Sequence, residues 1–123
     1  MTHHVIISIA SNRNQSEKLA AARNELNQIL DAPQYTSELW TEPVGRRRTR
    51  SLYLNQLVNA NYEGTQEGLT ARLKQIEVQL GRTDQERLRG IVDIDLDLLL
   101  FDNERLHLRD WERPYIQQLI KEL

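Results

Sequence analysis

Val92-Asp93-Ile94-Asp95-Leu96-Asp97-Leu98-Leu99-Leu100-Phe101 is the segment on which the fold and the chemistry of this chain depend. Large apolar residues alternate here with three aspartates, and successive side chains of a β-strand point to opposite faces. The segment therefore predicts a strand with one face in the core and three neighbouring carboxylates on the other. Carboxylates that close repel one another, and a bound cation relieves the repulsion.

A magnesium site is the chemical interpretation of this strand. Mg²⁺ prefers oxygen ligands, takes one or two carboxylates from a protein and completes its shell with water and substrate phosphates. The pattern thus indicates a site for phosphoryl or pyrophosphoryl transfer. Alternating aspartates also occur on strands that face solvent or that protect the edge of a sheet. The strand alone leaves both interpretations open.

Composition narrows the class of protein. A chain of 123 residues predicts a single domain, residues 1–123, with a substantial core. Sixteen basic and eighteen acidic residues give a net charge of −2, which does not favour nucleic acid or an anionic membrane as a partner. The absence of cysteine excludes thiolate catalysis, and His3, His4 and His107 lack the spacing of a metal site. Without an apolar segment of ~20 residues or a signal-peptide pattern, we expect a soluble cytoplasmic protein.

The order of the expected elements indicates a fold. Hydrophobic periodicity and turn residues predict four strands and three helices. The strands are expected at 5–9, 34–40, 53–62 and 92–101, and the helices at 16–30, 65–80 and 112–123. The order β-α-β-β-α-β, with a closing helix, predicts an α+β ferredoxin-like sandwich, an antiparallel sheet with helices on one face. The other face is then open for a ligand or for oligomerisation.

Several segments of the chain match the pattern of a known family. They are Ile76–Arg82, Asp93–Glu104, the strand end Ser11-Asn12, the loop Thr41…Pro43-Val44-Gly45, Tyr53-Leu54-Asn55 and Arg113-Pro114-Tyr115. Together they resemble the 6-hydroxymethyl-7,8-dihydropterin pyrophosphokinases over nearly the whole chain. Members of that family transfer pyrophosphate from ATP to a pterin alcohol in folate biosynthesis and release AMP.

The resemblance implies a role for each matching residue. Asp95 and Asp97 would bind two Mg²⁺ ions that hold the ATP phosphates, and both would be catalytic together with Arg82. Asn55 would form a hydrogen bond with the edge of the pterin. The remaining implied contacts are Thr41, Val44, Tyr53 and Tyr115 with the pterin, and Glu77, Arg82 and Arg113 with ATP.

Each of these residues also has a purely structural interpretation. Tyr53 and Tyr115 could be ordinary residues at the edge of the core, and charged residues such as Glu77 and Arg82 are common near helix ends. The loop Arg46–Arg50 could be solvated or could fold over ATP. Asn55 is harder to explain structurally, because asparagine is uncommon in strands.

The sequence departs from the family mainly around the nucleotide. Ala10 stands where the family has glycine, Val92 and Asp93 stand in place of an Arg-Thr pair, and Arg89 in place of a tryptophan. A Pro-His segment after the last strand and a C-terminal extension are missing. Loss of an arginine that meets a transferring phosphoryl group can cost several orders of magnitude in rate.

Three functional hypotheses therefore stay open. The first is an active pyrophosphokinase, and the second is a catalytically impaired homologue that binds a nucleotide, a pterin or a protein partner. The third is an oligomerisation module that uses the open sheet face. Asn55 and the aspartates fit the third poorly, since unpaired charges are costly in a buried interface.

Overall fold

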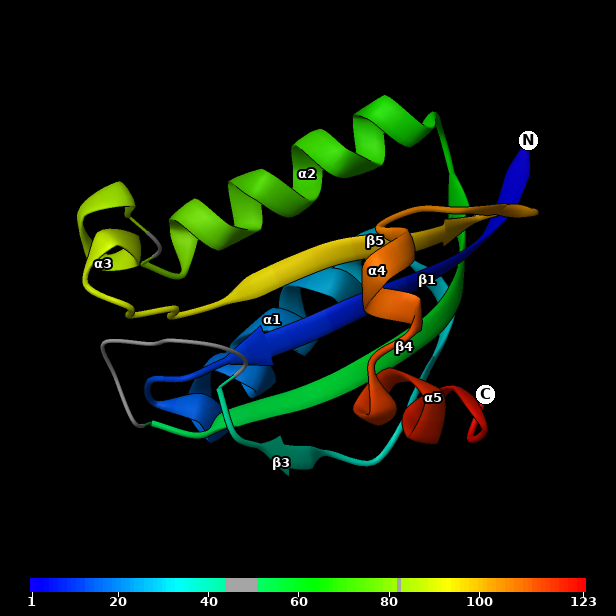
Figure 1. Cartoon of the computed structure of the whole chain (residues 1–123). Coiled ribbons are helices and arrows are strands. Elements are labelled where there is room, and N and C mark those ends of the chain that lie inside the picture. Colours follow the sequence, from blue (N-terminus) through cyan, green and yellow to red (C-terminus); the bar gives the residue numbers. More distant parts are fainter. Residues whose placement is uncertain (44–50, 82) are drawn as a thin grey trace.

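A single antiparallel sheet organises the molecule (Figure 1). The computed structural model describes residues 1–43, 51–81 and 83–123, without the side chains of Asp84 and Arg87. The strands are β1 (Thr2–Ser11), β2 (Asp31–Tyr35), β3 (Leu39–Thr41), β4 (Tyr53–Glu63), β5 (Asp95–Phe101) and β6 (Glu104–Arg105). The helices are α1 (Gln15–Ile29), α2 (Gln66–Gln79), α3 (Asp84–Leu88), α4 (Leu108–Trp111) and α5 (Pro114–Ile120).

The strand order confirms the α+β ferredoxin-like fold. The strands lie in the order β2-β4-β1-β5-β6, and β3 pairs with β4 beyond the end of β2. The helices α1 and α2 pack on one face of the sheet, and their buried residues form the main core with alternate residues of the strands. In α1 these residues are Leu19, Ala22 and Leu26, which recur at helical spacing. In α2 the Thr65 hydroxyl accepts a hydrogen bond from the Gly68 backbone N–H at 3.0 Å and so caps the helix.

The second face of the sheet is covered in part rather than open along its whole length. Figure 1 shows α4 and α5, in orange and red, on the side of the sheet away from α1. Ile116 and Leu119 of α5 form a smaller core with Ile6, Leu57 and Leu99. The uncovered part of this face lies beside the beginning of β5, where the aspartates are.

A bulge explains why the apolar residues at the end of β5 do not alternate. Ile6 pairs with Leu100, whereas Ile7 pairs with Leu98, so Leu99 is the extra residue. Such an insertion reverses the side-chain alternation beyond it. Leu98 consequently packs in the main core, while Leu99 and Leu100 both pack on the α5 side.

Several expected boundaries were wrong. The strand expected at 34–40 is interrupted, because the hydroxyl of Thr36 accepts from the Leu57 backbone N–H at 3.0 Å and replaces a ladder bond. The strand expected from Val92 begins at Asp95, and the expected loop 83–90 contains α3. The last helix begins at Pro114, since a residue before proline disfavours helical geometry and Arg113 is extended.

Two parts of the sequence-based hypothesis lie outside the described residues: Val44 with the loop Arg46–Arg50, and Arg82. Among the described residues, no helix has the length and apolar character needed to cross a membrane.

Candidate active site

Asp95 and Asp97 lie at the junction of two cavities. A small cavity of about 130 Å³ opens on the uncovered part of the second sheet face. A large cavity of about 670 Å³ lies between α2, β5 and the start of α4. Both aspartates line both cavities, because residues two apart in a strand share a face and stand next to each other.

The small cavity brings together most of the residues that the sequence singled out. From that set its lining includes Thr41, Tyr53, Asn55, Asp95, Asp97, Arg113 and Tyr115. They come from β3, β4, β5 and the segment that begins α5, which are far apart in the sequence. Two tyrosines, an asparagine and an arginine thus surround the aspartate pair within one small volume.

Asn55 is held in a defined orientation at the bottom of the small cavity. The side chain is 2% exposed, and its Nδ2 donates to the Leu39 carbonyl at 3.0 Å and to Thr41 Oγ1 at 2.8 Å. Because β3 takes up the amide donors, Oδ1 is the atom of Asn55 that can serve a ligand. The site therefore suits a flat ring that presents an N–H donor at its edge.

The electrostatics of the pair are unusual at Asp97. Burial raises the pKa of this carboxyl to about 7, assisted by the charges of Asp95, Asp110 and Glu77. Such a carboxylate gains most when a cation binds, because the cation removes the repulsion that raised the pKa. Nearby, burial and the charge of Asp110 raise the pKa of Tyr115 to about 12, so its hydroxyl stays protonated at neutral pH.

The large cavity is elongated along α2. The residues of α2 that line it are Gln66, Thr70, Leu73, Lys74, Glu77 and Val78, which form one stripe of the helix. Glu77 stands nearest the aspartates, and its Oε2 accepts a hydrogen bond from the Leu96 backbone N–H at 2.8 Å. This bond ties α2 to β5 beside the aspartate pair.

Comparison with known proteins is consistent with this arrangement. Residues 6–123 match the family described as 7,8-dihydro-6-hydroxymethylpterin-pyrophosphokinase. The chain belongs to this family. A curated relative, the mitochondrial folate synthesis bifunctional protein of Pisum sativum, is 35% identical over 79 residues. The match covers 58% of this chain and 15% of that protein, so the chain spans only a small part of the relative's length.

The carboxylates of this pyrophosphokinase-family chain fit Mg²⁺. Within residues 1–43, 51–81 and 83–123, no three His, Asp or Glu side chains converge as a complete set of metal ligands. A pair is sufficient for Mg²⁺, which obtains its other ligands from water and phosphates. The raised pKa of Asp97 is consistent with this fit, since burial, and to a smaller extent the neighbouring carboxylates, disfavour its charged form when no cation is bound.

Asp93 corrects the expectation of three clustered carboxylates. It precedes β5 and lines neither cavity. Its side chain is buried, and Oδ1 lies 3.5 Å from Arg13 Nε. The physical reason is that the chain leaves the strand pattern before Asp95, so the alternation of faces does not extend to Asp93.

Arg113 lies beside the small cavity rather than along the large one. Its Nε donates to Asp110 Oδ1 at 3.1 Å, and both residues line the small cavity with Tyr115. The resemblance implied a contact with ATP phosphates. Arg113 shares the lining of the small cavity with the aspartate pair, and its contact with ATP stays a prediction.

Sequence reasoning missed Glu42 and Asp110 in the small cavity, and Lys74 and His107 in the large one. Asp110 and His107 reach the site because the short segment after β6 folds back over β5. Trp111 fixes that fold: its indole N–H is shared between the carbonyls of Leu99 at 3.1 Å and Leu106 at 3.0 Å. An indole contact of this kind leaves no periodic signal in the sequence.

Proposed function

We propose that this chain transfers pyrophosphate from ATP to the hydroxymethyl group of 6-hydroxymethyl-7,8-dihydropterin and releases AMP, a step of folate biosynthesis. The observation that carries the proposal is the position of Asp95 and Asp97 between two cavities of different size. The family supports the reaction type. ATP and two Mg²⁺ ions are the co-substrate and cofactor that the proposal requires.

The large cavity suits the nucleotide, with its triphosphate directed toward the aspartates. Asp95 and Asp97 would hold Mg²⁺ from the protein side, and the ion would supply neutralisation of phosphate charge. The pterin hydroxyl oxygen then forms a bond to the β-phosphorus while the bond from that phosphorus to the α,β-bridging oxygen breaks. AMP leaves with that oxygen, and the hydroxyl proton passes to solvent. Positioning and electrostatics account for most of the catalysis in such transfers.

The small cavity suits the pterin. Asn55 offers Oδ1 to an N–H of the ring, and Tyr53 and Tyr115 provide aromatic surfaces among the lining residues. Thr41 Oγ1 accepts a hydrogen bond from Asn55 Nδ2, so Oδ1 is the atom of Asn55 that faces the ligand. These residues bind and orient the ring so that its hydroxymethyl group lies toward the aspartate pair.

The direct test is AMP formation from ATP and Mg²⁺, with and without 6-hydroxymethyl-7,8-dihydropterin. We expect AMP to form only with the pterin. Asn55→Ala removes the amide that donates to β3 and the Oδ1 acceptor that we propose for the pterin ring. We expect the KM for the pterin to rise ~10- to 100-fold. Pterin-independent AMP, or none at high enzyme concentration, would contradict the proposal.

A homologue that binds its ligands without catalysis is the second candidate. The observation that favours it is Asp93, which stands where the family has part of an Arg-Thr pair and is buried against Arg13 instead of lining the nucleotide cavity. Melting temperature with Mg²⁺ and a non-hydrolysable ATP analogue separates the two candidates. Stabilisation without any pterin-dependent AMP supports binding alone, because a ligand that binds the native state raises the melting temperature.

A further inference from the structure

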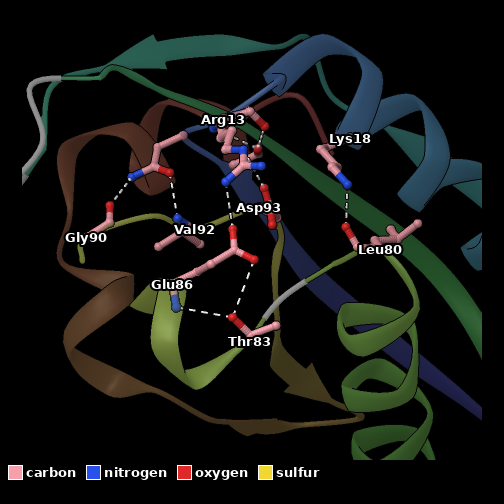
Figure 2. A network of polar contacts seen from close by, with 10 residues as sticks. Arg13, Lys18, Leu80, Thr83, Glu86, Gly90, Val92 and Asp93 are labelled. Carbon is pink, nitrogen blue, oxygen red and sulfur yellow. Dashed lines mark hydrogen bonds and ion pairs between the residues drawn. The ribbon is translucent and has the colours of Figure 1, made fainter. Parts of the chain in front are cut away.

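A polar network lies just outside the two cavities, around the segment that leads from α2 into β5 (Figure 2). Thr83, at the start of this segment, lines the large cavity. Its hydroxyl accepts from the Glu86 backbone N–H at 3.1 Å, which caps α3. The Ile91 backbone N–H then donates to the Glu86 carbonyl at 2.8 Å and closes the segment into a compact turn. Through Thr83, the network therefore supports part of the lining of the large cavity.

Asn12 attaches the far end of this segment to β1. Its backbone N–H donates to the Val92 carbonyl at 2.9 Å, and its Oδ1 accepts from the Val92 backbone N–H at 2.6 Å. Its Nδ2 donates to the Gly90 carbonyl at 2.8 Å, and the residue is 3% exposed. The buried side chain thus extends the β1–β5 pairing beyond the strand itself.

Arg13 joins the two halves of the segment. Its Nη1 donates to Glu86 Oε2 at 2.8 Å, and its Nε lies 3.5 Å from Asp93 Oδ1 (Figure 2). That oxygen is buried and has no hydrogen-bond partner among the described residues. Arg13 thereby links α3 to the residue that stands two positions before Asp95.

Lys18 supports the same arrangement from α1. Its ammonium group donates to the Leu80 carbonyl at the end of α2, and its charge acts on Asp93. A Cβ added at Gly81, whose φ is +105°, would lie 3.2 Å from Asp93 Oδ2. Because of this close approach, the segment that follows α2 has little room to move toward Asp93.

We propose that Arg13 is a positioning residue for nucleotide binding, which holds residues 83–92 against β1 so that Thr83, the described residue of this segment that lines the large cavity, is in place before ATP arrives. The inference rests on the proposed function for the role of the large cavity. A preformed wall raises affinity because ligand binding does not have to order it. The small cavity has no lining residue in the segment, so the effect is selective for the nucleotide.

The test compares Arg13→Ala with Arg23→Ala in the full chain. Arg23 is the control, since it likewise has two side-chain partners, Glu38 at 3.1 Å and Gln56 at 2.9 Å, but lines neither cavity. Hydrogen exchange of the ligand-free protein is measured together with the Kd for a non-hydrolysable ATP analogue with Mg²⁺. We expect Arg13→Ala to speed exchange within residues 83–92 and to raise the Kd ~5- to 20-fold, with neither change in the control.

Two further readouts separate positioning from a general loss of structure. The KM for ATP is expected to rise in Arg13→Ala while the KM for the pterin stays within about twofold. Arg13→Lys, which keeps a cation beside Glu86 and Asp93, is expected to retain part of the nucleotide affinity. Unchanged exchange in residues 83–92, or equal losses for both substrates, would overturn the inference. Absence of AMP from the wild-type protein would instead count against the proposed function, since the exchange and Kd measurements do not need turnover.

Discussion

Asp93 and Asp97 come from one alternating segment, but the structure gives them opposite surroundings. Asp93 faces the cations Arg13 and Lys18, which offset part of the rise in pKa that burial and Glu86 cause. Burial raises the pKa of Asp97 to about 7, and the charges of Asp95, Asp110 and Glu77 add to the rise. One carboxylate is partly compensated by cations, and the other lies among charges of its own sign.

The difference predicts a structural role for Asp93 and a functional one for Asp97. A buried carboxylate that faces cations needs those partners, because removal of one leaves a buried charge uncompensated. A carboxylate held among others destabilises the metal-free protein and recovers that free energy when a cation binds. Residue type and spacing are the same in both, so the neighbours and not the pattern assign the role.

The largest expected effect is the loss of activity on removing Asp97. Asp97→Asn keeps the shape of the side chain but removes a charge that we propose holds Mg²⁺, and we expect pterin-dependent AMP formation to fall by about three orders of magnitude or more. Asp102→Asn is the control, because Asp102 is exposed at the other end of β5 and lines neither cavity. If Asp97→Asn were about as active as the control, there would be no basis for assigning different roles to Asp93 and Asp97.

The next effect is on the pH dependence of magnesium binding. Mg²⁺ needs the ionised carboxylate, so we expect its affinity to fall up to about tenfold per pH unit below pH 7 and to level off above. In the metal-free protein, the raised pKa of Asp97 makes the stability of the fold change with pH in the opposite direction to magnesium affinity. The folded state binds the extra proton, so stability falls as pH rises from about 4 to about 7.

Titration calorimetry with Mg²⁺ and the ATP analogue, and melting curves without metal, measure these two trends. Asp97→Asn serves as the reference, since it is expected to flatten the stability trend between pH 4 and pH 7. Magnesium affinity that is constant from pH 5 to pH 8 would show that the carboxyl is ionised throughout.

A smaller effect is expected on stability. Arg13→Gln leaves the buried Asp93 oxygen without its guanidinium and should lower the free energy of unfolding by about 1 kcal/mol, because Arg13 is half exposed. Adding Asp93→Asn should restore part of the loss, since it removes the uncompensated charge. Urea unfolding of the wild type, Arg13→Gln, Asp93→Asn and the double variant gives the comparison, and a loss in the double variant equal to the sum of the two single losses would contradict it. Asp97→Asn is expected to raise the melting temperature at pH 8.

The sequence predicted what depends on local periodicity. The apolar spacing of Leu19, Ala22 and Leu26 is enough to give α1 and its buried face. The binding role of Asn55, which stays a prediction, was implied by the family resemblance and supported by the rarity of asparagine within strands. The family resemblance extended this set to residues that now share the small cavity.

The rest could not be predicted because it depends on contacts between distant residues. The role of Asp93 follows from Arg13, eighty positions earlier, and no periodicity records that contact. The bulge beside Ile6 and Ile7 is a property of two paired strands and not of either alone. Asp110 enters the site only because the indole of Trp111 binds the Leu99 carbonyl.

The smallest expected effect tests whether Asp110 contributes to the charge around Asp97. Its carboxylate raises the pKa of Asp97 and accepts the Arg113 Nε–H. Asp110→Asn removes the charge and keeps an oxygen that can accept from Arg113, so the pKa of Asp97 should fall and the pH midpoint for magnesium binding should move down by less than about one unit. At pH 8 the loss of one negative charge should weaken Mg²⁺ a few-fold. The loss should be smaller at low pH, where Mg²⁺ displaces the proton of Asp97 and the site gains one positive charge instead of two, whereas structural damage would weaken binding equally at every pH. An unchanged midpoint would mean that burial and Asp95 alone account for the state of Asp97.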